Sequence, residues 1–180
     1  MIVGHIGVAA ALQRARPRAA PWWLLVAAVA PDLVDVGYAL AGVCNPFGLF
    51  SHTLPAAALI AACLGGAALL TGRRETAAVV VLLVLLHLPP DFITGRKLYW
   101  PGGELHGLQL YHRPLADFLL ESLVLGAGWL LVHPVAAVPR WMRSAWTLGA
   151  LLLVQGTVDR FSERLMKPTA CAAPAVSALR

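Results

Sequence analysis

Residues 36–72 read VGYALAGVCNPFGLFSHTLPAAALIAACLGGAALLTG, and this stretch contains no Asp, Glu, Lys or Arg. It is too long for one crossing of a membrane, because a helix of roughly 17–25 residues already spans the hydrocarbon core. Asn45, Pro46 and Gly48 are turn-forming residues near its middle. The stretch therefore predicts a helical hairpin in a membrane, with His52 at the start of the second arm.

The composition of the whole chain also indicates a membrane protein. Of its 180 residues, 59% are hydrophobic and 13% are charged, whereas a soluble domain has about 45–50% apolar and about 25% charged residues. The formal net charge is +5, but the 14 Lys and Arg residues lie in ones, twos and threes between apolar runs. This distribution is typical of loops that flank membrane spans, so we expect no nucleic-acid partner.

Five stretches are apolar enough, and long enough or nearly so, to cross a membrane: residues 22–43, 54–71, 77–93, 115–133 and, more weakly, 143–158. Residues 2–12 are too short to cross and favour a half-inserted helix. The expected fold is all-α, a polytopic transmembrane bundle of four to five spans plus this short N-terminal helix. We assign residues 1–159 to a single integral membrane domain and expect 160–180 to be a flexible polar tail.

Seven acidic and histidine residues lie within or at the ends of these apolar stretches. Ionisable groups in hydrocarbon are costly unless they are paired, so each one is a candidate for function. Successive spans alternate in direction, and the ends that carry these residues open on the same side. We therefore expect all seven to converge near one membrane face: Asp32, Asp35, His52, His87, Asp91, Asp117 and Glu121.

Structural roles compete for the same residues. Asp32 and Asp35 follow Pro31 and can simply cap a helix that resumes there. Asp117 and Glu121 share one helix face at i, i+4 spacing, and an interhelical salt bridge to a loop arginine or lysine is the alternative for that pair.

His87 and Asp91 also have i, i+4 spacing, which places both on one face of a continuous helix. Pro89 and Pro90 lie between them, and we expect these prolines to kink or end the helix. A group of imidazoles and carboxylates suits Zn²⁺, Mn²⁺ or Fe²⁺. Two histidines with two to four carboxylates can hold one or two such ions, which then activate water for hydrolysis at neutral pH.

Four short motifs occur in a particular order: GH at residues 4–5, APDLVD at 30–35, FSHTL at 50–54 and LHLPPD at 86–91. This order resembles that of the metal-dependent hydrolases of bacterial inner membranes typified by YdjM, and in particular their Ser-His-Ser/Thr subgroup. A Pro-Gly-rich loop that leads to a helix bearing Glu121 also resembles this subgroup. The similarity covers roughly residues 4–125.

The resemblance implies a multi-pass protein of the bacterial inner membrane with a divalent metal cofactor, most readily zinc, as one or two ions. The metal ligands that it implies are His5, Asp32, His52, His87 and Asp91. Asp35 and Glu121 are the candidate catalytic residues, as general bases where they do not bind metal. Membrane lipids are the expected partners, and the expected substrate is a lipid or a lipid-linked phosphate or ester.

The position of His5 raises a geometric question, because a straight span over residues 22–43 places His5 on the opposite side from His52. A helix that ends near Ala30, paired with residues 2–12, would form a half-depth hairpin and bring His5 beside Asp32. Two other functions use the same residues. Intramembrane acids and histidines also serve proton- or metal-coupled transporters, and a polar cluster can tie helices together in a non-catalytic scaffold.

Overall fold

The computed structural model describes residues 3–165, with side chains described as far as residue 161. Within this range the protein is all-α, as predicted, and has six helices: α1 Val3–Ala15, α2 Pro21–Leu40, α3 Leu54–Leu70, α4 Arg74–Thr94, α5 Pro114–Val132 and α6 Ala145–Leu165. Three short 3₁₀ turns lie in the connections: η1 Pro46–Gly48, η2 Leu110–His112 and η3 Arg140–Arg143. The α4–α5 connection also holds a small antiparallel pair, β1 Lys97–Leu98 with β2 Leu105–His106.

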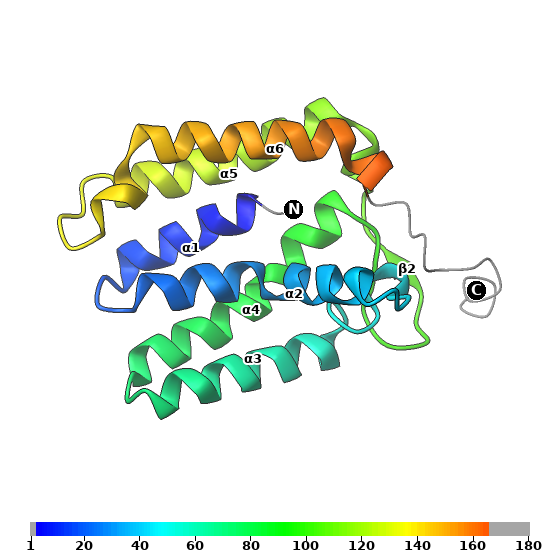
Figure 1. Ribbon diagram of the computed structural model, residues 1–180, viewed down its shortest axis with the longest axis horizontal. Coiled ribbons are helices and arrows are strands. Elements are labelled where there is room, and N and C mark those ends of the chain that lie inside the picture. The colour runs from blue at the N-terminus through cyan, green and yellow to red at the C-terminus, as the bar shows by residue number, and fades with distance from the viewer. Residues whose placement is uncertain (1–2, 166–180) are drawn as a thin grey trace.

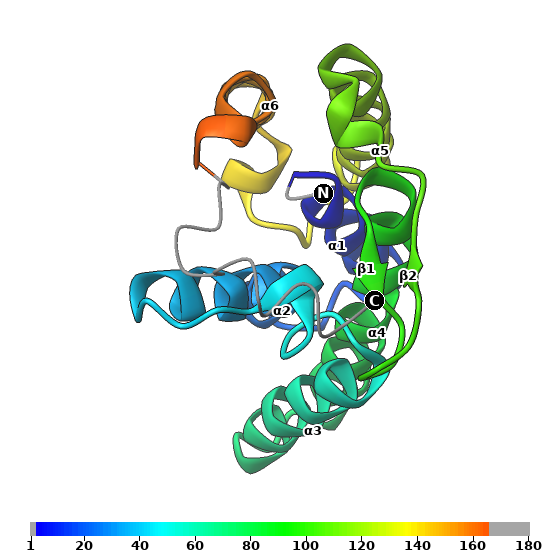
Figure 2. The same ribbon diagram turned by 90° about the vertical axis from the view of Figure 1, so that its right-hand side faces the viewer.

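The helices run roughly along one common direction (Figure 1). The α1–α2, α3–α4 and α5–α6 turns lie at one end of the bundle, and the α2–α3 and α4–α5 connections lie at the other. Viewed from that second end, α1 is central, with α5 and α6 on one side and α4 and α3 on the other (Figure 2). The short helix α1 packs mainly on α5 and also contacts α2 and α4.

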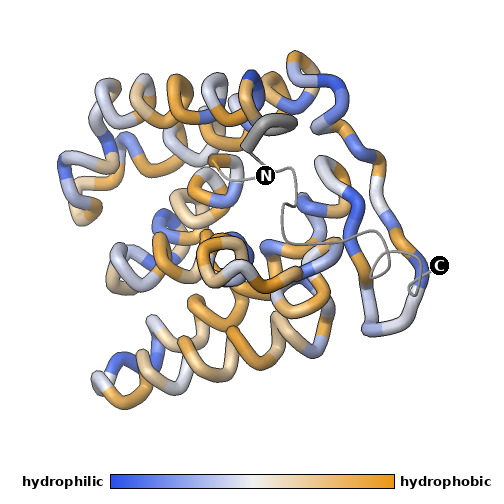
Figure 3. Tube along the Cα trace, turned by 45° about the vertical axis from the view of Figure 1, so that its right-hand side comes forward, coloured by the Kyte–Doolittle hydropathy of each residue, from blue (hydrophilic) through white to orange (hydrophobic). Residues whose placement is uncertain are grey.

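Three of the described helices, α2, α4 and α5, are long and apolar enough to cross a membrane, and α3 is a shorter apolar helix. Apolar residues run along these helices, whereas hydrophilic ones gather at the turns (Figure 3). The predicted fifth span is a helix, α6, but it does not have the composition of a span. It carries Gln155, Asp159 and Arg160 in its second half, and its last turns include the first residues of the predicted tail 160–180. The rest of that tail lies outside the described residues.

The prolines do not end their helices. The helix α2 continues through Pro31, and α4 continues through Pro89 and Pro90. The predicted helix end near Ala30 was therefore wrong, and α4 does not end at its prolines. A proline removes one backbone donor, and neighbouring helices in a bundle can compensate for that loss. Because α2 is continuous, Asp32 and Asp35 lie inside it and are not caps.

Glycine lets α1 and α5 approach closely. A Cβ atom on Gly7 would lie 2.7 Å from the Cα of Leu125, and a Cβ on Gly128 would overlap the backbone of Gly7. Small residues at such contacts allow two helix backbones to pack directly against each other, which is a common means of helix association in membranes. This contact fixes α1 in the centre of the bundle.

Candidate metal centre

Four of the predicted metal ligands come together from three separate segments of the chain. Asp32 is on α2, His52 precedes α3, and His87 and Asp91 are on α4. Each offers one ligand atom, and the four atoms lie within 4.8 Å of one another. His52, His87 and Asp91 are at most 2% exposed, whereas the side chain of Asp32 is 21% exposed. Three of the four residues are therefore fully buried, and Asp32 is the one that reaches the surface.

The spacing within this His/Asp group resembles the edges of a tetrahedron. The two Nε2 atoms of His52 and His87 are 3.2 Å apart. Asp91 Oδ2 lies 2.7 Å from His52 Nε2 and 3.4 Å from His87 Nε2. Asp32 Oδ1 lies 3.5 Å and 3.6 Å from the same two nitrogens. Four ligands around a tetrahedral zinc ion are about 3.3 Å apart, because each bond is about 2.0–2.1 Å long, so one ion fits this group.

The position of the proton on the His87 ring also suits an ion at this group. His87 Nδ1 lies 2.8 Å from the carbonyl oxygen of Ala28. A carbonyl only accepts hydrogen bonds, so Nδ1 carries the proton of a neutral His87 and the lone pair of Nε2 faces the group. The other oxygen of Asp32, Oδ2, is buried without a hydrogen-bond partner in the described part of the chain. The group is rich in acceptors, which is the chemistry that a cation requires.

A second layer of side chains orients His52. Its Nδ1 lies 2.7 Å from Ser51 Oγ and 3.3 Å from Asp35 Oδ2. Ser51 in turn donates to Asp35, and so does Asn45. With Nδ1 held in this way, His52 Nε2 is available either for a proton that it donates to Asp91 or for an ion. A carboxylate behind a histidine is typical of metal sites, where it fixes the orientation of the ring.

Sequence reasoning missed two parts of this second layer. Asn45 is expected only as a turn residue, and its hydrogen bonds to Asp35 and Ser51 form because the loop folds back on α2. The carbonyl of Ala28 has no sequence signal, since every residue has one. A turn-forming asparagine shortly before a Ser-His pair is the sequence signal that points to the role of Asn45.

Glycine at position 48 makes room for the ring of His52. Gly48 has φ +73°, and a Cβ there would lie 2.8 Å from His52 Nδ1. A side chain at this position would therefore be strained and would also collide with the imidazole ring of His52. Both constraints select glycine.

His5 lies beside Asp91 but is not one of the four residues whose ligand atoms come together. Its Nε2 donates to Asp91 Oδ1 at 2.9 Å, and its ring stacks on that of His87 with centroids 3.6 Å apart. Burial lowers the pKa of His5 to about 4, so its imidazole is neutral at physiological pH. The helix α2 continues through Pro31, and α1 contacts α2, α4 and α5, which brings His5 to α4.

Asp117 and Glu121 do not join the His/Asp group, although they lie in the first half of α5, which begins at the same end of the bundle. The helix α1 contacts both α5 and α4. Glu121 Oε2 instead accepts hydrogen bonds from the backbone N–H groups of Val3 and Gly4 at 3.0 Å and 3.1 Å. In the described part of the chain no lysine or arginine forms a salt bridge with Asp117 or Glu121, which also removes the alternative of an interhelical ion pair.

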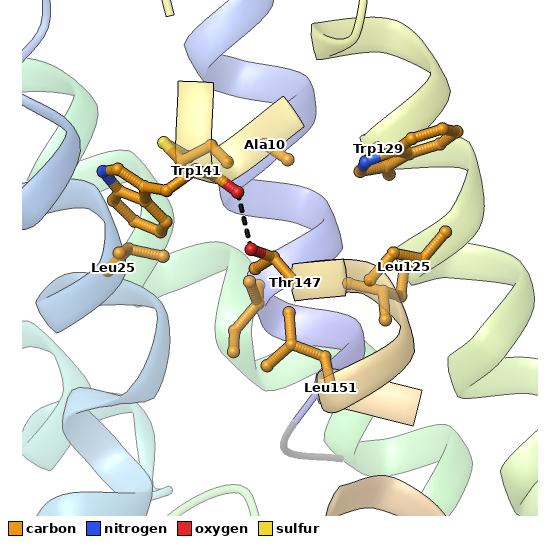
Figure 4. A pocket seen from close by; sticks show the side chains of 10 residues that line it. Ala10, Leu25, Leu125, Trp129, Trp141, Thr147 and Leu151 are labelled. Atoms are coloured by element: carbon orange, nitrogen blue, oxygen red, sulfur yellow. Dashed lines mark hydrogen bonds between the residues drawn. The ribbon is translucent and has the colours of Figure 1, made fainter. Parts of the chain in front are cut away.

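A separate apolar pocket lies among α1, α2, α5 and α6 (Figure 4). Among the side chains that line it are Leu25, Leu125, Trp129 and Trp141. Its one hydroxyl, that of Thr147, donates to the carbonyl of Trp141 at 2.6 Å. No lining residue is ionisable, and the indole Nε1 of Trp129 has no hydrogen-bond partner among the described residues, so the pocket is apolar apart from this donor and the Thr147 hydroxyl.

The fold and the site together define a polytopic membrane protein with a buried His/Asp group that can hold a metal ion. Residues 1–162 match the YdjM inner membrane protein family, and the chain belongs to that family. It is accordingly an inner membrane protein with several candidate spans. No curated protein and no solved structure matches the chain.

Proposed function

We propose that this protein is a membrane-embedded metal-dependent hydrolase of the Ser-His-Ser/Thr subgroup. Asp32, His52, His87 and Asp91 would hold its divalent ion. The observation that carries this proposal is the near-tetrahedral spacing of the four ligand atoms, 2.7–3.6 Å in the five measured pairs. Two nitrogen and two carboxylate ligands favour zinc over magnesium, which prefers six oxygen ligands.

A zinc ion in such a site lowers the pKa of a coordinated water and polarises an ester or phosphate group. The residues of the chain supply the remaining functions. Ser51 and Asp35 hold the Nδ1 proton of His52 and keep its ring in place. The carboxylate of Asp35 is 31% exposed, so it can also exchange a proton with the membrane interface.

We assign Glu121 a positioning role in this proposal. It holds the start of α1 through the backbone of Val3 and Gly4, and α1 carries His5. His5 in turn donates to Asp91. Removal of Glu121 would therefore affect Asp91 through the position of α1 rather than through contact with substrate.

A lipid or a lipid-linked phosphate or ester is the substrate class that the location supports. The His/Asp group lies toward the end of the bundle that holds the α2–α3 and α4–α5 connections. Arg96, Lys97 and Arg113 belong to the α4–α5 connection, and Lys97 Nζ lies 3.7 Å from Asp35. Basic side chains at a membrane interface attract anionic headgroups, and this end is where a headgroup meets the site.

Zinc analysis of the purified protein in detergent, paired with a hydrolysis assay on phospholipids and polyprenyl phosphates, tests the proposal. We expect one zinc per chain and hydrolysis of one of these substrates, with both lost in His52→Ala and Asp91→Ala. The exposed histidine variant His112→Ala is the matched control and should retain both. Absence of bound metal would contradict the metal site, and bound metal without hydrolysis would indicate transport or a structural role.

A further inference from the structure

The apolar pocket among α1, α2, α5 and α6 contains a hydrogen-bond donor that has no acceptor (Figure 4). The indole Nε1 of Trp129 is buried and has no partner among the described residues. The edge of the ring that carries Nε1 points toward the other lining side chains. A buried donor without an acceptor is costly and uncommon. A molecule that fits this pocket should therefore be apolar and carry one acceptor.

The pocket lies toward the end of the bundle opposite to the His/Asp group. Trp141 and Met142 line it from η3, which belongs to the α5–α6 turn at that end (Figure 1). Trp22 and Trp146 are 68% and 89% exposed, and Trp22 stacks on Trp141. Tryptophans gather where a membrane meets water, so this end lies at a membrane interface. The pocket therefore opens to the leaflet opposite to the one that meets the His/Asp group.

Positive charge lies beside the pocket, at the end of α5. Arg143 Nη1 donates to the carbonyl of His133 at 3.5 Å, and the His133 ring packs on that of Trp129 with centroids 4.6 Å apart. Arg143 Nε is buried and has no acceptor in the described part of the chain. No acid of the described residues forms an ion pair with Arg140 or Arg143. An anionic group at the interface would complete this corner.

The order of these features matches the order of groups in a glycerophospholipid. Trp129 lies four residues before His133 on α5, which is about 6 Å along the helix axis. From the interface inward, the protein presents the guanidinium of Arg143, then the Trp129 donor, then the side chains of Leu125 and Leu151. A glycerophospholipid presents its phosphate, then its ester carbonyls, then its acyl chains.

The size of the pocket also favours a lipid over a soluble ligand. Its volume is only about 30 Å³, so it takes a short part of one acyl chain. The remainder of the ligand must lie outside the pocket, on the apolar surface of the helices. Only a molecule that is itself part of the bilayer has a suitable environment there.

We infer that this pocket binds a glycerophospholipid of the leaflet opposite to the His/Asp group. Trp129 donates to an ester carbonyl of the lipid, Arg143 pairs with its phosphate, and part of one acyl chain lies against Leu25 of α2 and Leu151 of α6. The bound lipid thereby joins α6 to α2. The inference is independent of the proposed hydrolase activity, because it uses none of the residues of the His/Asp group.

Native mass spectrometry of the delipidated full chain in detergent, titrated with phosphatidylglycerol, tests this inference. We expect wild-type protein to bind one phosphatidylglycerol more tightly than any further one. Trp129→Phe keeps the aromatic packing and removes only the donor, and it should weaken this binding about fivefold, as for loss of one hydrogen bond. Arg143→Gln should also weaken it about fivefold. It should bind diacylglycerol, which has no phosphate, as well as wild type does.

Two variants at the same end of the bundle are the matched controls. Trp146→Phe changes an exposed tryptophan outside the pocket, and Arg18→Gln removes an exposed charge from the α1–α2 turn. Both should bind phosphatidylglycerol as wild type does, whereas Leu151→Trp should fill the pocket and abolish the tight binding. All variants should elute as wild type in gel filtration.

Two outcomes would overturn the inference. One is that Trp129→Phe or Arg143→Gln binds phosphatidylglycerol as tightly as wild type. The other is that wild-type protein has no tight site for this lipid, whether it is a monomer or forms a dimer in which a second copy covers the pocket. Either result would mean that no lipid supplies the missing acceptor.

Discussion

The His/Asp group and the three carboxylates of Asp117, Glu121 and Asp159, here called the acidic group, both adjoin the short helix α1, yet their chemistry is different. In the His/Asp group, the second nitrogens of His52 and His87 each have a partner of their own, namely Ser51 with Asp35 and the carbonyl of Ala28. In the acidic group, Asp117 Oδ1 has no hydrogen-bond donor among the described residues. The first is an organised set of nitrogen and oxygen ligands, and the second is a set of oxygens alone.

The two groups therefore differ in the ligand atoms that they offer. A second layer that fixes each ring and its proton is typical of zinc-type sites. The two groups are nevertheless linked, because α1 contacts both. Its backbone donates to Glu121, and its His5 donates to Asp91.

The largest difference between the two groups should appear when one aspartate of each is neutralised in metal-free protein. Asp91→Asn removes the acceptor of His5 and His52, and we expect it to lower the free energy of unfolding by about 3–5 kcal/mol, the usual effect of breaking a buried pair. Asp117→Asn removes one of three like charges and should leave stability unchanged or raise it. Thermal unfolding of both variants in EDTA measures these effects, and a similar loss in both would contradict the distinction.

Gly128→Ala should disturb both groups at once. Its Cβ would overlap the backbone of Gly7 and displace α1 from α5, at a cost of about 1–3 kcal/mol, as for other overpacked cores. Thermal unfolding, together with zinc titration, checks this. Gly126→Ala is the matched control on the same helix, because a Cβ there meets nothing within 4 Å. If zinc affinity stayed at the wild-type value in Gly128→Ala, α1 would not link the two groups.

Gly48→Ala should disturb the His/Asp group alone. The new methyl group would collide with the His52 ring, and we expect zinc affinity to fall about 10–100-fold, as when the support of a metal ligand is lost. Isothermal titration with zinc measures this fall.

The control for Gly48→Ala is Gly42→Ala, which has a similar φ of +67° but open space around its Cβ. It carries the same backbone strain without the collision. Zinc affinity should therefore stay at the wild-type value in Gly42→Ala, and an equal fall in both variants would attribute the effect to strain alone.

Asp35→Asn should give the smallest effect. The amide still contacts Ser51 and Asn45 but no longer carries the charge that favours a proton on His52 Nδ1. Zinc affinity should fall about tenfold. Isothermal titration with zinc checks this, and Glu104→Gln, at an exposed acid in the α4–α5 connection, should bind as wild type. An unchanged zinc affinity in Asp35→Asn would remove Asp35 from the metal centre.

Much of the site could be predicted from the sequence, because acids and histidines are few in this chain and lie in apolar stretches. Asp32, His52, His87 and Asp91 were expected together and are together. The position of His5 and the hydrogen bonds of Glu121 to the start of α1 could not be predicted in the same way. Both depend on where α1 lies. A helix of 13 residues is too short to cross the membrane, so the hydropathy pattern of the sequence fixes neither its depth nor the helices that it packs against.

By itself, the sequence determined that the chain is a helical membrane protein and which residue types meet in its His/Asp group. Apolar length and the cost of charge in hydrocarbon are local properties, and they can be read residue by residue. Only the tertiary structure decided that the ionisable residues form two groups rather than one. The backbones of Gly7 and Gly128 meet, which packs α1 against α5, and such a contact exists only when two distant segments pack together.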